Sequence, residues 1–85
     1  MAREEIRVME QKTELGKIVL NDITRLISSS DKYLSDYLNN LRLSGFVLKK
    51  EIEMFGKTSY IYEKHHNDEY ETKEVIKITK KSNSN

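Results

Sequence analysis

Polar side chains near the middle of the chain have the types and the spacing needed to hydrogen-bond with the edges of nucleic-acid bases. Leu34, Leu38 and Leu41 fall at i, i+4 and i+7, which predicts the apolar stripe of a helix. At about 100° per residue, Asn39 and Asn40 project away from that stripe. Because an asparagine amide can form a bidentate pair with adenine, this helix would present a polar face suited to a major groove.

The rest of the expected contact surface comes from the same helix, the turn before it and the hairpin after it. Lys32 can reach guanine or phosphate, and Asp36 can accept a hydrogen bond from cytosine, while Tyr33 and Ser35 flank them. Hydroxyl and basic side chains elsewhere would contact phosphates, which position a protein without reading sequence. The predicted DNA-binding residues are Ser29, Ser30, Lys32, Tyr33, Ser35, Asp36, Asn39, Asn40, Arg42, Lys49, Lys57 and Thr58.

The chain offers little that could support catalysis or hold a metal. His65, His66 and Asp68 form the one cluster of metal-ligand types, but adjacent histidines lack the i, i+4 spacing of a helical zinc pair. There is no glycine-rich phosphate loop and no nucleophile with a local signature. We therefore predict a protein that is not an enzyme and has no metal or cofactor.

Length and composition indicate one small domain. The 85 residues are 36% hydrophobic and 34% charged, so a monomer buries a modest core and a homodimer would bury more. We expect residues 1–81 to form the domain and residues 82–85 a disordered tail. Without cysteine, neither a disulfide nor a thiolate zinc site can form. No apolar run is long enough to span a membrane, and we predict a cytoplasmic protein.

Charge is segregated along the chain although the net charge is only +1. From residue 72 onward four lysines oppose a single glutamate, whereas residues 63–71 are acidic. Any DNA-binding face must therefore arise from local asymmetry.

The first 30 residues give a mixed pattern. Ile6 and Met9 have helical spacing over residues 2–16, although an extended segment is also allowed. A short β-branched run at 17–20 is followed by Asn21, a candidate cap for a short helix over 22–27.

The central part of the chain is clearer. Serines at 28–30 predict a turn, and a helix is expected from about Asp31 to Ser44, ended by Gly45 in the left-handed conformation. Beyond the glycine the apolar period changes to two, which predicts a β-hairpin over residues 46–63. A polar loop follows, and then a C-terminal segment that fits either a helix or a strand.

This order of elements resembles a winged helix-turn-helix over residues 20–62. The segment "LSDYLNNLRLSGFV" is similar to the recognition helix, helix-ending glycine and first wing strand of small bacterial and archaeal regulators, such as the multiple-antibiotic-resistance and arsenic-responsive repressors. The resemblance implies an α+β domain with three helices, a β-hairpin wing and an additional C-terminal helix or strand. Ile23 and Ile27 would face inward from the positioning helix, and Lys57 would lie at the wing tip.

The function that this resemblance implies is sequence-specific binding of double-stranded DNA by a homodimeric compact repressor. The size of the chain is compatible with a plasmid or phage regulator. One alternative is a segregation adaptor that binds centromere repeats through the same face. A second alternative is a winged helix that binds another protein rather than DNA, which the near-neutral charge favours.

Overall fold

The computed structural model describes the backbone of residues 3–28 and 31–83, and the side chains of residues 5–24 and 34–81. Five strands and one helix account for most of these residues. In chain order they are β1 (Arg3–Glu14), β2 (Lys17–Ser28), α1 (Asp31–Leu43), β3 (Val47–Met54), β4 (Lys57–His65) and β5 (Lys73–Asn83).

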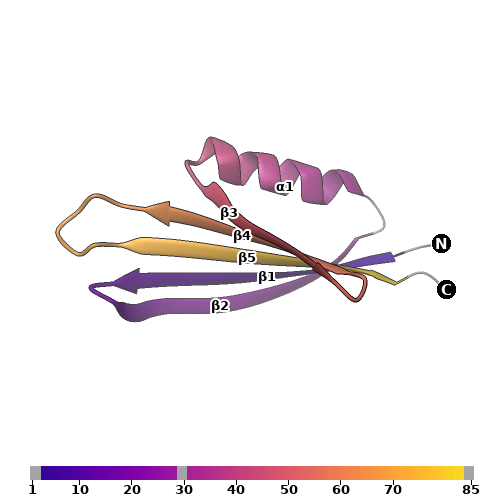
Figure 1. Cartoon of the computed structure of the whole chain (residues 1–85), viewed down its shortest axis with the longest axis horizontal. Helices are drawn as coiled ribbons and strands as arrows, with labels where there is room; N and C mark the ends of the chain where they lie inside the picture. The colour runs from indigo at the N-terminus through magenta and orange to yellow at the C-terminus, as the bar shows by residue number, and fades with distance from the viewer. Residues whose placement is uncertain (1–2, 29–30, 84–85) are drawn as a thin grey trace.

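The strands form one antiparallel sheet in the order β2-β1-β5-β4-β3. The C-terminal strand β5 therefore lies at the centre, and β2 and β3 are the two edges. Helix α1 lies over one face of the sheet (Figure 1). The β1–β2 turn and the β4–β5 loop meet at one end, while the β3–β4 turn lies at the end where the chain begins and finishes (Figure 1).

The predicted winged helix-turn-helix is wrong. The segments expected to be the first helix and the positioning helix are instead the paired strands β1 and β2. Within the described residues α1 is the one helix, so no second helix is present to form a helix-turn-helix with it. The helical spacing of Ile6 with Met9 misled the interpretation, because Ile6 and Val8 alternate on the buried face of β1.

Two tight hairpin turns explain why the sheet forms as it does. Leu15 and Gly16 have φ angles of 50° and 77°, and Phe55 and Gly56 have φ angles of 51° and 74°. Two consecutive residues with positive φ match the type I′ turn, whose twist suits paired antiparallel strands. Each turn thus joins its two strands directly, although one of the two turn residues is not glycine.

The predicted helix is confirmed, and so is its ending. Gly45 has a φ of 96°, the Phe46 N–H donates to the Leu41 carbonyl (N···O 3.0 Å), and the Gly45 N–H donates to the Arg42 carbonyl (3.1 Å). This is the bonding pattern of a Schellman motif. Lys64 of β4 also donates to the carbonyl of Ser44 (2.8 Å), which ties the end of the helix to the sheet.

The predicted hairpin is also present, as β3 and β4, with a bulge at Lys49. The C-terminal segment is a strand that pairs with both β1 and β4. This strand extends to Asn83, two residues into the predicted tail, and residues 84–85 lie outside the described part.

The core lies between α1 and the central strands. Leu34 and Leu41 of the helix are buried with alternate residues of the sheet. The sheet residues in this cluster are Ile6, Val8, Tyr62, Ile76 and Ile78. Among them Ile78 is 0% exposed and Ile6 is 1% exposed. A single helix therefore covers the middle of one face of the sheet.

The helix is short, at 13 residues, and presents one apolar stripe. In the part of the chain that the structure describes, no helix combines the length and the hydrophobicity needed to cross a bilayer.

We expect Ile78→Ala to lower the free energy of unfolding by about 2–5 kcal/mol, because it leaves a cavity at the centre of the core. Urea denaturation would measure the change. Val47→Ala is the matched control, since Val47 is 56% exposed and its truncation should change stability by less than about 0.5 kcal/mol. Equal losses in the two variants would contradict this assignment of the core.

Candidate anion-binding site

The face of the sheet opposite α1, here called the open face, is rich in positive charge. Residues paired across antiparallel strands share a face, so the registers assign each described strand residue to one side. Among these residues, six cationic side chains lie on the open face against two carboxylates. The cations are Arg7, Lys50, Lys57, Lys73, Lys77 and Lys81, and the carboxylates are Glu5 and Glu63.

A pair of hydroxyl groups lies at the centre of this face. Ser59 of β4 is directly opposite Thr79 of β5, and their oxygen atoms are 3.3 Å apart. Arg7 is opposite Thr79 on the other side of β5. Lys57 and Lys81 are paired with each other two residues from the Ser59–Thr79 pair, toward the C-terminal end of β5. Lys77 lies two residues from Thr79 in the other direction. We call Arg7, Lys57, Lys77 and Lys81 the basic cluster.

The basic cluster and the two hydroxyl groups line a shallow depression of about 390 Å³. Glu5 supplies the one carboxylate among the residues that line it. Lys57, Lys77 and Lys81 each lie two residues along a strand from Ser59 or Thr79, a separation of roughly 6.6–6.8 Å. Arg7 lies directly opposite Thr79 on the neighbouring strand. The depression is open to solvent, because Arg7, Lys57 and Lys81 are exposed.

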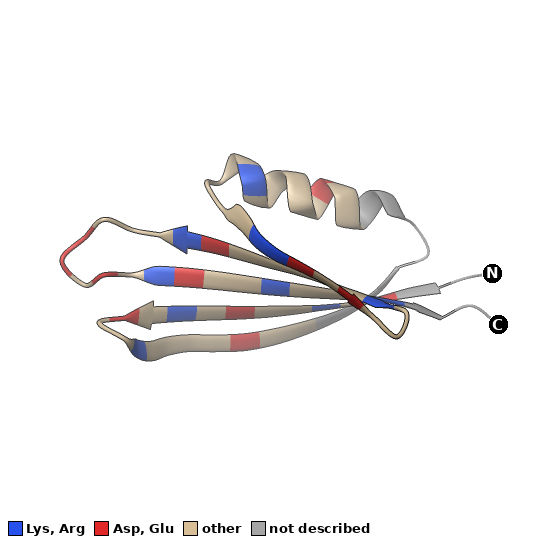
Figure 2. Cartoon of the chain, in the orientation of Figure 1, with Lys and Arg blue, Asp and Glu red and all other residues tan. Residues whose placement is uncertain are grey.

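The alternation of β5 produces this arrangement. Ile76 and Ile78 face the helix and are buried, so Lys77 between them must point to the open face. Lys73 and Lys81, four residues to either side, have the same orientation. Figure 2 shows the resulting alternation of charged and uncharged residues along the strands.

Some of the other charged groups on the sheet form ion pairs. On the open face, Glu63 is 3.4 Å from the ammonium of Lys73 and 3.2 Å from Nε2 of His65. The hydrogen bond with His65, and then the one with Lys73, lowers the pKa of Glu63 below its ordinary value. On the opposite face, Lys12 lies 4.0 Å from Glu14. Within the described residues, by contrast, no ion pair involves a member of the basic cluster.

This arrangement is suited to a phosphate or another oxyanion. Lysine ammonium and arginine guanidinium groups donate several hydrogen bonds each, and a hydroxyl group can add another. The lining contains no aromatic side chain, so it offers no surface on which a base could stack. The chemistry therefore favours contact with a phosphate backbone over contact with bases.

The predicted DNA-binding residues are not gathered on this face. Ser35, Asp36, Asn39 and Asn40 are exposed on α1, on the other side of the sheet. Arg42 is exposed there too, and its Nη2 donates to Oδ1 of Asn39 (3.0 Å).

The remaining predicted contacts are divided between the two faces. Lys57 belongs to the basic cluster, whereas Thr58 points to the helix side and is half-buried. Lys49 is exposed at the bulge in β3. Ser29 and Ser30 lie outside the described residues, as do the side chains of Lys32 and Tyr33.

An apolar groove of about 660 Å³ lies between α1 and β3. Leu38, Phe46 and Leu48 line it with Tyr62, and burial raises the pKa of the Tyr62 phenol above its ordinary value. Three of the predicted DNA-binding residues, Ser35, Asn39 and Arg42, also line it. Because most of its surface is apolar, this groove is poorly matched to phosphate.

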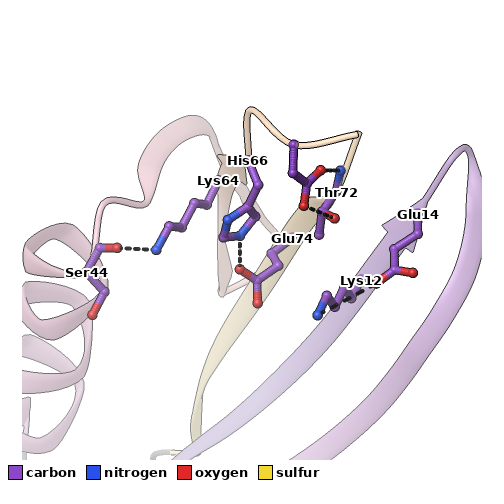
Figure 3. A network of polar contacts seen from close by, with 8 residues as sticks. Lys12, Glu14, Ser44, Lys64, His66, Thr72 and Glu74 are labelled. Atoms are coloured by element: carbon purple, nitrogen blue, oxygen red, sulfur yellow. Dashed lines mark hydrogen bonds and ion pairs between the residues drawn. The ribbon is translucent and has the colours of Figure 1, made fainter. Parts of the chain in front are cut away.

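The histidine-containing loop is held by internal hydrogen bonds. His66 contacts Oε2 of Glu74 through Nε2 (2.6 Å), and Asp68 accepts hydrogen bonds from the backbone and the side chain of Thr72 (3.0 and 2.8 Å) (Figure 3). These two bonds lower the pKa of Asp68. In the described ranges, 3–28 and 31–83, no group of three or more potential ligands is arranged to hold a metal ion.

Sequence reasoning missed Arg7, Lys77, Lys81, Ser59 and Thr79 as parts of one site. The concentration of lysine after residue 72 was the available signal, but its use required β5 to be a strand between β1 and β4. Arg7 could be added only once β1 was known to pair with β5.

Comparisons with known proteins provide no family for this chain: no protein-family model matches it, and neither the curated proteins nor the solved structures contain a significant match.

We expect His65→Ala to raise the pKa of Glu63 toward its ordinary value, measured by NMR titration of the carboxyl group. A lowered carboxylate pKa stabilises the fold above the unfolded-state pKa, and this stabilisation is lost as the pH falls through the folded-state pKa. His66→Ala is the matched control, because His66 contacts Glu74. A shift of the Glu63 pKa in the control alone would contradict the assigned pairing.

Proposed function

We propose that this protein binds the phosphate backbone of double-stranded DNA through the open face of its sheet. The observation that carries the proposal is the basic cluster, in which four cations surround the Ser59–Thr79 hydroxyl pair and none forms an ion pair within the described residues. A phosphate backbone can neutralise several cations at once, and the counterions released from the DNA favour binding.

Contact with a duplex suits this face better than contact with single strands. Proteins that bind single strands without sequence preference generally stack bases on aromatic side chains, and the depression has none. Phosphate contacts fix a protein on DNA without conveying base sequence. The proposed binding is therefore largely independent of sequence.

Base readout by Asn39 and Asn40 would require a different docking surface. These residues are exposed on α1, whereas the basic cluster lies on the opposite side of the sheet. One DNA groove cannot receive the exposed side of the helix and also contact the open face. The proposal therefore does not include a reading helix or a repressor mechanism.

Two further expectations accompany this function. We propose a cytoplasmic location, which the absence of cysteine supports. We also propose that the chain forms a homodimer, because eleven large hydrophobic side chains among the described residues are exposed beside a small core.

The function can be tested by fluorescence anisotropy with a short DNA duplex at salt concentrations between about 50 and 200 mM. If all four cations contact phosphates, the logarithm of the association constant should fall with the logarithm of salt concentration with a slope near −3.6, about −0.9 for each phosphate. A single strand of the same length should bind less tightly.

The double variant Lys57→Ala/Lys81→Ala should weaken binding and reduce the magnitude of that slope by about 1.8. The charge-matched control is Lys12→Ala/Lys17→Ala, which removes two cations from the helix side of the sheet. This variant should leave the slope unchanged. Equal losses in the two variants would contradict the proposed face. Absence of DNA binding in the wild-type protein would favour the protein-interaction alternative.

A further inference from the structure

The outer edge of β2 is long and exposed. The strand has 12 residues, and every described side chain in it, from Lys17 to Asn21 and on to Thr24, is exposed. Ile18 is 59% exposed and Ile23 is 61% exposed. An edge strand of this length and hydrophobicity is a template for pairing with another strand.

The opposite edge of the sheet is different. Strand β3 has only 8 residues. Both edge strands contain one bulge, at Lys49 in β3 and at Val19 in β2, but residues 20–28 of β2 pair with β1 without interruption. Lys50, Glu51 and Glu53 add further charge along the same edge. Charged side chains protect edge strands from pairing. Four of the 8 residues of β3 are charged, whereas only Lys17, Asp22 and Arg25 are charged among the 12 residues of β2. The sheet thus has one protected edge and one that is open to a partner.

The direction of one backbone amide indicates how β2 can pair. The N–H of Ile23 donates to Oδ1 of its neighbour Asp22 (2.9 Å), so this amide points away from β1. When two edge strands pair antiparallel, a residue whose N–H and carbonyl point outward forms two hydrogen bonds with the residue opposite: each N–H donates to the carbonyl of the other. Ile23 can therefore form such a pair once the carboxylate of Asp22 moves aside.

We propose that two copies of this chain associate through antiparallel pairing of their β2 strands, with Ile23 opposite Ile23 of the second copy. In this register each Asp22 lies opposite Thr24 of the other copy, whose hydroxyl group can donate to the displaced carboxylate. Moving the register so that Asp22 faces Asp22 would place two like charges directly opposite each other, which is unfavourable. A second copy of this chain is the expected partner, because a twofold axis brings the same strand of both copies together. No other partner sequence is then needed to form the pair.

The proposed dimer is a continuous sheet with a continuous open face. Five strand intervals of about 4.8 Å separate the two β5 strands, so the two basic clusters would lie on the same face, roughly 24 Å apart when measured across the strands. Association does not depend on DNA, and its test therefore stands apart from the proposed function.

The first measurement is the mass of the free protein by light scattering or sedimentation. We expect about 20 kDa, twice the chain mass of 10.0 kDa, in the absence of DNA. Ile23→Lys should return the mass to that of a monomer. Val47→Lys is the matched control on β3, with a similarly exposed side chain, and should remain a dimer. A monomer at all concentrations of the wild-type protein would overturn the proposal.

The second measurement uses the absence of native cysteine. In a hydrogen-bonded antiparallel pair the Cα atoms are about 5.5 Å apart, which suits a disulfide. Ile23→Cys should therefore form a covalent dimer rapidly under mild oxidation. Asn21→Cys should not, because in this register it faces residue 25 of the other copy. Val47→Cys should not either.

If Asn21→Cys crosslinked as fast as Ile23→Cys, the proposed register would be wrong. If Val47→Cys did so, the choice of β2 as the pairing edge would be wrong. A wild-type dimer in which Ile23→Cys fails to crosslink would overturn pairing through β2.

Discussion

Leu34 and Leu41 of α1 pack on alternate residues of the central strands, and this contact fixes the character of both sheet faces. One helix of 13 residues can cover only one side of a five-stranded sheet, so the other side faces water. Residues next to each other on a strand point to opposite faces, and each buried isoleucine of β5 is therefore followed or preceded by an outward-facing residue. In β5 that residue is lysine at position 77, between Ile76 and Ile78. The core and the basic cluster are thus two sides of the same strands.

The distribution of charge follows from this constraint and gives the sheet two different faces. Lys73 and Glu63 neutralise each other, while the members of the basic cluster form no ion pair within the described part of the chain. A net charge of +1 hides the asymmetry, because carboxylates such as Glu10, Glu51 and Glu74 occupy the helix side. The overall charge of a small sheet protein is therefore a poor guide to the potential at one face.

Sequence reasoning succeeded where local signals determine the structure. The leucine stripe, Gly45 and the change to period two predicted α1 and the following hairpin, since each depends on neighbouring residues. It failed for β1 and β2, because their apolar residues fit both the helical period and the strand period. In addition, Asp22 accepts a backbone N–H in a strand, much as a helix-capping residue would. The matching turns "ELGK" and "MFGK" were a signal for two hairpins. The site could not be predicted, because its residues come from strands joined only by long-range pairing.

The most direct test of the account is an NMR titration of the isotope-labelled protein with duplex DNA, followed through the backbone amide signals. The account predicts that the largest shifts occur at Arg7, Ser59, Lys77 and Thr79 and that the exposed residues of α1 change little. Shifts concentrated at Asn39 and its neighbours on the helix, with the open face unchanged, would contradict it.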